Sequence, residues 1–471
     1  MIVHSYHVAS SKTKQSRKKK PVKSGAAPRD TLICALLMHH FGQISPSDMC
    51  IAERQFPTRV RADLQKAVEQ IFAGGEGVRL FCGVRQEYGH EGIEFSSLLL
   101  HESHYPPVAV PPQYEEIDIG EENPIRCLKS GLWLLQQDKM RYAILLAPAL
   151  QHGMTNGIRF QIATASGMQG VEIADRFFKT LERAVNESHS YRGKILSLEM
   201  ERNYLGRSAG IKVHKLRTVE RDQVILPKKT LALLERNVIQ FVQRRERLAS
   251  YGQATKKGIL FYGPPGTGKS HTIHYLARAL KGHTTFLITA EQVGLLGEYM
   301  ALARLLQPSV VVIEDVDLIA RDREDMGSPC EEATLNKLLN EMDGLKEAAD
   351  ILFILTTNRP ESLEAALASR PGRVDQAIEF PLPDEEGRAK LIRLYGKGTE
   401  LSDELIAMIV SRTKNVSAAF IKELIRRSVQ FQLERDTNQR IEAQDVDNAL
   451  DEMLFSGGSL NVKLLGGNHG E

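Results

Sequence analysis

One segment of the chain combines glycine, lysine and serine in a spacing that binds phosphate. It reads Gly263-Pro264-Pro265-Gly266-Thr267-Gly268-Lys269-Ser270 and matches the pattern G-x4-G-K-[ST]. Glycines allow backbone N–H groups to converge on phosphate oxygens, and a helix N-terminus adds partial positive charge. We expect Lys269 to reach the β- and γ-phosphates, Ser270 to ligate Mg²⁺, and His271 to extend the nucleotide contacts.

A second candidate group is a pair of acids that follows an apolar run. Residues 309–313 read SVVVI, and Glu314 and Asp315 come next. A buried parallel strand would place both acids at its carboxyl end, where open α/β sheets bind ligands. We expect Glu314 to hold Mg²⁺ and Asp315 to activate an attacking water.

Polar residues farther along the chain are weaker candidates. The strand-like residues 350–357 end at Asn358, whose amide could orient that water. Taken alone, Asn358 is more simply interpreted as a turn residue before Arg359-Pro360. Arg370 and Arg373 belong to an RPGR turn, and arginine suits a developing phosphoryl charge. A solvated basic loop is the alternative interpretation of that turn.

A parallel sheet would bring these groups together. Residues 258–262 form a predicted strand directly before the glycine loop, and residues 271–280 form a predicted helix directly after it. An amphipathic helix is predicted at 230–248, and several strand–helix alternations follow the loop. This pattern predicts a parallel α/β sheet followed by a small helical region. The glycine loop occurs once, which indicates one nucleotide module per chain.

The ordered motifs resemble those of the AAA family of ATPases, within the AAA+ superfamily. The resemblance covers about residues 224–455 and rests on GPPGTGKS, VVVIEDVD, LLNEMDGL, TTN and SRPGRVD. It implies an α/β P-loop AAA+ module, made of a parallel sheet and a helical lid, that binds ATP and Mg²⁺ at the interfaces of a hexameric ring. Lys269 and Ser270 match the Walker A residues and Asn358 matches sensor 1. Arg370 and Arg373 match the pair that reaches the neighbouring subunit's site.

The resemblance also assigns residues around the adenine base. Residues 415–419 (NVSAA) stand where the family's lid approaches the nucleotide, and Tyr251 and Gly252 stand near the usual adenine pocket.

Two positions depart from the family pattern. The usual Walker B ending is Asp-Glu, whereas this chain has Glu314-Asp315. The family's mitochondrial branch that assembles respiratory complex III has a similar Glu-Asp-Val-Asp, so this order need not abolish hydrolysis. Leu295 stands at the aromatic position of the central pore, where it could grip an unfolded chain. The alternative is that Leu295 and Leu296 pack inward as core.

The N-terminal half contains no comparable group of residues. We expect a disordered basic tail at 1–29 and a helical or mixed region with an extended linker at 31–122. An α+β domain is expected at 124–223. The two AAA+ subdomains would occupy 224–383 and 384–455, and a flexible tail 456–471. A mixed α+β N-terminal region therefore precedes the ATPase module.

Composition restricts the class of protein. The chain has 471 residues and five cysteines without a CxxC pair, which excludes a disulfide framework and fits a reducing cytoplasm. No apolar run reaches the roughly 18 residues of a membrane span, so no integral membrane contact is expected. Residues 1–29 hold eight of the 61 basic residues and no acid, leaving 53 bases against 59 acids. This tail is interpreted as a nucleic-acid arm, a targeting sequence, an anionic-surface tether or a solvated tail.

The residues and the resemblance together predict a cytoplasmic, ring-forming ATPase. It would couple ATP hydrolysis to remodelling or unfolding of a macromolecular substrate, with an unidentified protein client or adaptor. One alternative is a nucleotide-binding scaffold with little hydrolysis, suggested by Glu314-Asp315. The other is a nucleic-acid-associated motor, suggested by the basic tail.

Overall fold

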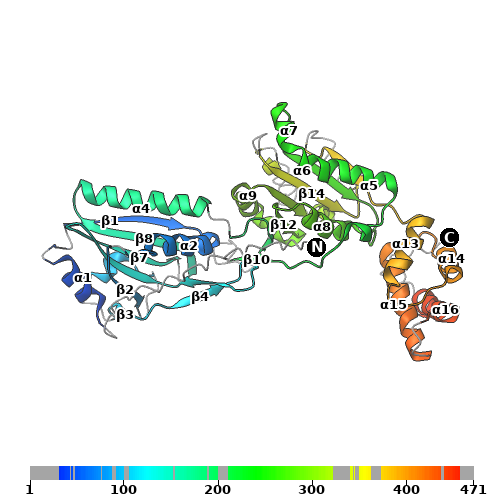
Figure 1. Cartoon of the computed structure of the whole chain (residues 1–471), viewed down its shortest axis with the longest axis horizontal. Coiled ribbons are helices and arrows are strands. Elements are labelled where there is room, and N and C mark those ends of the chain that lie inside the picture. The colour runs from blue at the N-terminus through cyan, green and yellow to red at the C-terminus, as the bar shows by residue number, and fades with distance from the viewer. Residues whose placement is uncertain are drawn as a thin grey trace, which may run out of the picture. The chain divides into compact units, whose positions relative to one another are not determined.

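In a computed structural model, the described residues form two compact units, each built around its own sheet (Figure 1). The first unit contains the described residues within 1–115 and 126–185, and the second contains those within 116–125 and from residue 186 onward. The structure describes residues 31–42, 44–45, 48–75, 77–86, 92–99, 105–151, 154–187, 190–199, 210–321, 340–342, 344, 349–361, 373–435 and 440–456.

Antiparallel pairing builds the sheet of the first unit. In the part of this unit that the structure describes, six strands are ordered β1-β8-β7-β6-β2-β3. They are β1 (Met49–Phe56), β2 (Val78–Arg85), β3 (Val108–Val110), β6 (Gly131–Gln137), β7 (Met140–Gln151) and β8 (Met154–Ala165). Two of the predicted strands, 142–147 and 158–164, lie within β7 and β8.

Helices cover both faces of this sheet because its central strands are apolar on both sides. Leu132 and Leu134 of β6 contribute to a buried cluster with α1 (Ile33–Phe41) and α3 (Phe95–Leu98). Trp133 faces the other way and stacks on Phe72 of α2 (Arg61–Phe72), with ring centroids 4.9 Å apart. The long helix α4 (Met168–Glu187) packs on this second face through Phe177.

The second unit has a largely parallel sheet. Its described strands are ordered β10-β9-β12-β13-β14-β11-β15. The strands that follow residue 224 are β11 (Lys257–Tyr262), β12 (Thr284–Ile288), β13 (Ser309–Ile313), β14 (Ile351–Thr357) and β15 (Gln376–Glu379). All five residues of β13 are buried between β12 and β14. The predicted buried strand is confirmed, and residues 314–315 follow its carboxyl end.

The structure divides the chain differently from the expected boundaries at 122, 124 and 223. The regions 31–122 and 124–223 share the six-stranded sheet of the first unit, whereas β9 (Ile195–Leu198) and β10 (Ile211–Val213) join the second. The reason is long-range pairing, because β9 runs parallel to β12 with Ile195 opposite Thr285. Part of the predicted linker also belongs to the second unit, where Ile119 is fully buried. A separate two-stranded sheet pairs β4 (Tyr114–Ile117) with β5 (Ile125–Leu128).

The helix predicted at 230–248 is interrupted. It consists of α5 (Lys228–Leu234), a π-helical turn (Glu235–Gln240), α6 (Phe241–Gln243) and α7 (Arg245–Ser250). The break falls at Arg244, whose φ of −104° and ψ of 9° are not helical. The next residue, Arg245, donates its Nε–H to the Thr255 carbonyl oxygen and forms an ion pair with Asp350. These two contacts fix the start of α7.

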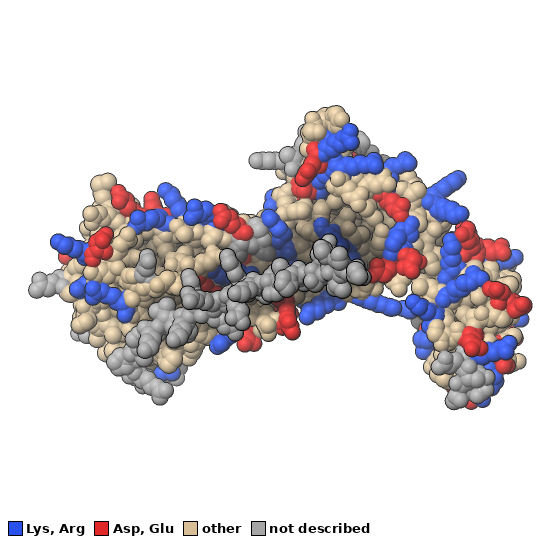
Figure 2. All heavy atoms as spheres, viewed as in Figure 1, with Lys and Arg blue, Asp and Glu red and all other residues tan. Residues whose placement is uncertain are grey.

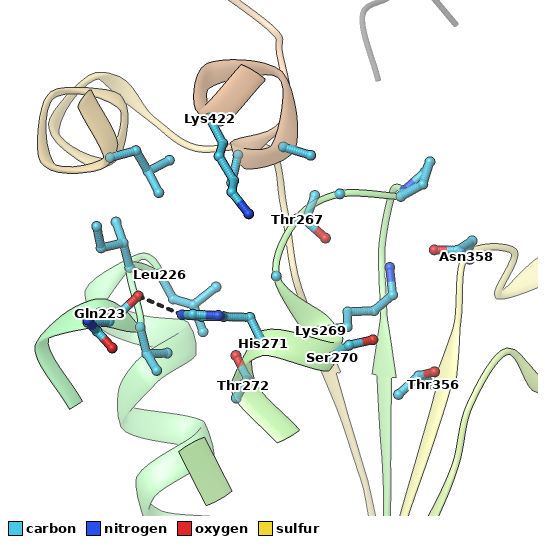
Figure 3. Close-up of a pocket in the computed structure, with 18 of the residues that line it drawn as sticks. Gln223, Leu226, Thr267, Lys269, Ser270, His271, Thr272, Thr356, Asn358 and Lys422 are labelled. Atoms are coloured by element: carbon cyan, nitrogen blue, oxygen red, sulfur yellow. Dashed lines mark hydrogen bonds between the residues drawn. The ribbon is translucent and has the colours of Figure 1, made fainter. Parts of the chain in front are cut away.

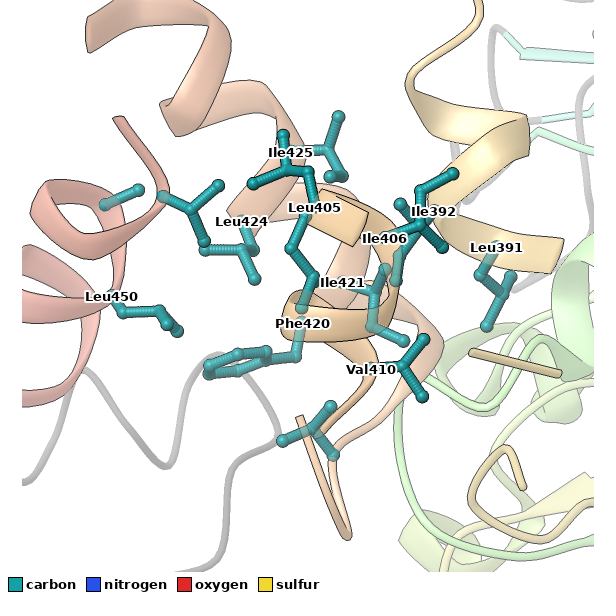
Figure 4. Packing of buried hydrophobic residues seen from close by; sticks show 14 of the residues in the cluster. Leu391, Ile392, Leu405, Ile406, Val410, Phe420, Ile421, Leu424, Ile425 and Leu450 are labelled. Carbon is teal, nitrogen blue, oxygen red and sulfur yellow. The ribbon is translucent and has the colours of Figure 1, made fainter. Parts of the chain in front are cut away.

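Helices also surround the sheet and form the lid. Within the described residues, helices that accompany the sheet include α8 (Lys269–Ala279), α9 (Leu296–Leu305) and α10 (Val316–Arg321). The lid contains α13 (Glu385–Tyr395), α14 (Asp403–Arg412), α15 (Ala418–Arg435) and α16 (Ala443–Asp451), followed by a π-helical turn (Glu452–Ser456). Figure 4 shows the apolar side chains that these helices bury against one another, including Phe420 and Leu424. The predicted helical lid is therefore present with its own core.

Acidic and basic side chains are interspersed on the face shown in Figure 2. The basic residues of the tail, 1–29, lie outside the described residues. Of the helices in the described part of the chain, none combines the length and apolar character that a bilayer span requires.

Candidate functional site

The glycine loop joins the carboxyl end of β11 to the start of α8. Gly263, Gly266 and Gly268 have φ values of 142°, 75° and 101°, a region that favours glycine. A Cβ at Gly263 would lie 2.3 Å from the Phe380 carbonyl oxygen, and one at Gly266 would lie 2.9 Å from the Ala419 Cβ. Glycine is therefore required both for the backbone conformation and for the close approach of the lid.

Lys269 is the first residue of α8 and is only 7% exposed. Its Nζ donates to the carbonyl oxygens of Gly263 at 2.7 Å and Pro264 at 3.0 Å. Burial lowers the pKa of Lys269 to about 8, although the charges of Asp315 and Asp317 partly offset this effect. The ammonium is thus held against the loop (Figure 3), with two partners that phosphate oxygens can replace.

The two acids after β13 face different partners. Glu314 Oε1 accepts a hydrogen bond from Ser270 Oγ at 2.7 Å. Asp315 has a left-handed backbone, with φ of 50°, and its Oδ1 accepts from Asn358 Nδ2 at 3.0 Å. The geometry brings Ser270 together with Glu314 and Asp315 together with Asn358.

The Ser270–Glu314 pair fits a magnesium ion. Hydroxyl and carboxylate oxygens are ligands that Mg²⁺ accepts, usually with waters and substrate phosphates completing the shell. In the described part of the chain, no group of three or more His, Cys, Asp or Glu side chains forms an all-protein metal site. Mg²⁺ that binds together with a nucleotide takes only one or two ligands from the protein. The hydroxyl of Ser270 and the carboxylate of Glu314, beside the glycine loop, fit this mode.

A pocket of about 390 Å³ extends from the loop, within the roughly 300–1,000 Å³ typical of ligand sites. Its far end is lined by Gln223 and by the apolar residues 224–226, Leu391, Tyr395 and Ala418. His271 lies between the two ends; burial lowers its pKa, and its Nε2 is 3.2 Å from the Gln223 carbonyl oxygen. The sequence reasoning missed residues 223–226 and the lid residues Leu391 and Tyr395. The apolar run at 224–226 before Pro227 was the available signal for the first group.

Tyr251 and Gly252 do not line this pocket, contrary to the expectation from the sequence. Tyr251 is 68% exposed, and Gly252 borders a separate hollow with Arg245 and His283. The reason is direction: both residues precede the amino end of β11, whereas the glycine loop follows its carboxyl end. Six strand residues separate these ends by roughly 20 Å.

The lid contacts the loop directly, as expected for residues 415–419. The Ala419 backbone N–H donates to the Gly266 carbonyl oxygen at 3.1 Å, and Asn415 adopts φ of 57° in the turn that precedes α15. One turn farther along α15, Lys422 also lines the pocket, and Figure 3 shows its side chain pointing into it. The lid therefore supplies one wall of the pocket.

The structure does not bring Arg373 to its own chain's loop. Arg373 packs against the amino end of β11, where a Cβ at Gly258 would lie 2.0 Å from the Arg373 carbonyl oxygen. Asp375 fixes this segment, because its Oδ2 accepts from the Gly258 N–H at 2.8 Å. Arg370 lies outside the described residues.

The candidate pore residues are part of the core. Leu295 is 7% exposed and Leu296 is fully buried. Only Thr289 separates β12 from the 3₁₀ helix Ala290–Leu295, which leads directly into α9. Of the two interpretations, inward packing is therefore the one observed.

Comparison with known proteins supports a nucleotide module in this part of the chain. A family model described as "ATPase family associated with various cellular activities (AAA)" matches residues 259–382. The ATP-dependent zinc metalloprotease FtsH of Mycoplasmopsis pulmonis is 34% identical over 233 residues, which cover 46% of this chain and 31% of that protein. The 26S proteasome regulatory subunit 8 homolog of Schizosaccharomyces pombe is 32% identical over 240 residues, covering 47% of this chain and 58% of that protein. The chain thus spans less than two thirds of the length of either relative.

Proposed function

Because residues 259–382 form an ATPase domain of the AAA family, we propose that this protein is a ring-forming ATP hydrolase that remodels protein substrates. The observation that carries the proposal is the arrangement around one 390 Å³ pocket of a buried lysine, a serine–glutamate pair and an aspartate–asparagine pair. ATP is the substrate of this site and Mg²⁺ its metal ion.

Each side chain has a role that follows from its position. Lys269 exchanges its two carbonyl partners for phosphate oxygens, and the loop N–H groups bind the same phosphates. Ser270 and Glu314 would hold Mg²⁺, which neutralises phosphate charge when it is bound. Asp315 accepts a proton from the attacking water, and Asn358 keeps that carboxylate oriented.

The ring assignment rests on Arg373 together with the family resemblance. Because Arg373 lies at the opposite end of β11 from its own glycine loop, it could act on phosphate only in another copy of the chain. An Arg373→Ala subunit should bind ATP without hydrolysing it. Mixing it with Lys269→Ala subunits should restore turnover, because each variant supplies what the other lacks. Verified mixed rings without recovered activity would contradict shared sites.

The protein-remodelling role rests on the relatives, whose names include a protease and a proteasome subunit. We infer that the first unit recognises the client or an adaptor, since its sheet and helices lie outside the ATPase module. Buried Leu295 and Leu296 argue against a grip on the client at that position. Cys34, Cys50, Cys82 and Cys127 are free thiols, which favours a cytoplasmic location.

Steady-state phosphate release tests the ATPase proposal, with an Asp315→Asn variant as comparison. The wild type should hydrolyse ATP with Mg²⁺, whereas Asp315→Asn should bind ATP and release phosphate at a rate reduced by about 10²-fold. Equal, background-level rates for both proteins would instead identify a nucleotide-binding scaffold. If the wild type is active, pull-down with the Asp315→Asn variant would identify the protein substrate, because this variant should retain both ATP and the bound client.

A further inference from the structure

A third acid, Asp317, is buried just beyond the two acids of the proposed site. It is 2% exposed and does not line the nucleotide pocket. Its Oδ1 accepts two hydrogen bonds from the end of β14, one from Thr357 Oγ1 at 2.8 Å and one from the Asn358 backbone N–H at 3.2 Å. Asp317 therefore contacts the residue whose side chain holds the Asp315 carboxylate.

The turn that carries Asp315 depends on the same end of β14. Its φ of 50° is unfavourable for a residue with a side chain and costs about 1–2 kcal/mol unless the surroundings hold it. The Asp315 backbone N–H donates to Thr356 Oγ1 at 3.0 Å, and the Asp315 carboxylate accepts from Asn358 Nδ2. Two bonds to Asp315 and two to Asp317 thus join the turn to three consecutive residues, 356–358.

A carboxylate suits this position better than a neutral side chain. One oxygen receives a hydroxyl and a backbone N–H, and bonds to an ionised acceptor are shorter and stronger than neutral ones. Thr357 Oγ1 is also fixed from its other side, because it accepts from the Arg359 N–H at 3.0 Å. The Asn358 backbone is thereby held on both sides of its peptide group, which fixes the direction of its amide.

We propose that Asp317 is a positioning residue for ATP hydrolysis, which acts by fixing Asn358 so that the Asp315 carboxylate faces the site of the attacking water. The proposal rests on the proposed ATPase function. It assigns Asp317 no contact with ATP, so its loss should impair the chemical step while leaving nucleotide binding intact. A purely structural role would instead lower binding and turnover together.

Full-length Asp317→Ala provides the first test, with turnover measured at saturating ATP and affinity measured with a fluorescent ATP analogue. We expect kcat to fall about 30- to 100-fold, as expected for misplacement of a catalytic group, while the Kd changes less than about threefold. Asp317→Asn keeps an acceptor oxygen and should recover most of that loss. Asp63→Ala is the matched control, since Asp63 is a buried aspartate of the first unit, and its kcat should equal that of the wild type.

A double-mutant cycle with Asn358→Ala separates positioning from a general effect. If Asp317 acts through Asn358, the double variant should be no slower than Asn358→Ala alone, within about twofold. The proposal would be overturned if the losses in kcat of the two single variants multiplied in the double variant. It would also be overturned by an unchanged kcat for Asp317→Ala, or by parallel losses of kcat and ATP affinity in that variant. If Asp317→Ala does not fold, Thr357→Val, which removes one of the two bonds, is subject to the same criteria. If wild-type protein hydrolyses no ATP, the proposed function fails and this proposal fails with it.

Discussion

Replacing Lys269 by methionine should separate nucleotide binding from the stability of the empty protein. Methionine keeps an unbranched apolar side chain in the buried site and removes the ammonium that bonds to the carbonyls of Gly263 and Pro264. A hydrogen bond to a charged group contributes about 1.5–3 kcal/mol, so the Kd for ATP should rise about 10- to 150-fold. Fluorescence titration with an ATP analogue measures this change.

The same substitution should alter how stability depends on pH. Burial lowers the pKa of Lys269 from 10.5 to about 8, a difference of roughly 3 kcal/mol between its charged and neutral forms. Between pH 8 and 10.5 the unfolded chain binds a proton that the folded protein has released, so the free energy of unfolding rises with pH. The wild type should therefore gain up to about 3 kcal/mol over this range relative to Lys269→Met.

Urea unfolding at pH 7.5, 9 and 10 would measure this difference by far-UV circular dichroism. Subtracting the variant from the wild type cancels the other groups that titrate in this range. The single tryptophan, Trp133, belongs to the first unit, so its fluorescence reports a transition that should not differ between the two proteins. Parallel pH profiles for wild type and variant, or an unchanged affinity for ATP, would refute this account of Lys269.

Three further predictions, made with four substitutions, test the walls of the pocket and the lid. Gly266→Ala should weaken ATP binding about tenfold by fluorescence titration, because the backbone φ of 75° and the Ala419 Cβ at 2.9 Å both oppose a side chain; normal affinity would contradict the close lid contact. Tyr395→Ala should weaken binding about fivefold through lost apolar contact, whereas exposed Tyr251→Ala should not; the reverse order would restore the original adenine assignment. Phe420→Ala should destabilise the lid by about 3–5 kcal/mol in urea unfolding, since Phe420 is 1% exposed; a loss below 1 kcal/mol would show that the lid core does not depend on it.

Local patterns predicted the secondary structure around the candidate site. The glycine loop, the strand before it and the helix after it are adjacent in sequence, so spacing alone places Lys269 and Ser270 at a helix N-terminus. The apolar run at 309–313 likewise placed Glu314 and Asp315 at the end of a central strand. The family resemblance then singled out Asn358 as sensor 1, since no local signal distinguishes Asn358 from a turn residue.

Features that depend on distant pairing or on chain direction were not predictable. The wrong assignment of Tyr251 arose from chain direction, because Tyr251 precedes the amino end of β11 whereas the glycine loop follows its carboxyl end. The expected domain boundaries missed the pairing of β9 with β12 because these strands are distant in the sequence. The left-handed φ of Asp315 and the four hydrogen bonds that join Asp315 and Asp317 to residues 356–358 also have no signature in the sequence around position 315.

Strands β9 and β10 have a consequence for any attempt to isolate the ATPase module. A fragment cut at residue 224, where the motifs begin, would lose both strands and leave the backbone groups of β12 without their neighbour on that side. It would also remove Leu198, whose backbone N–H donates to the hydroxyl of the buried Tyr299 at 2.8 Å. Unpaired sheet edges recruit other chains, so such a fragment should aggregate, whereas one that begins before residue 190 would keep β12 paired with β9.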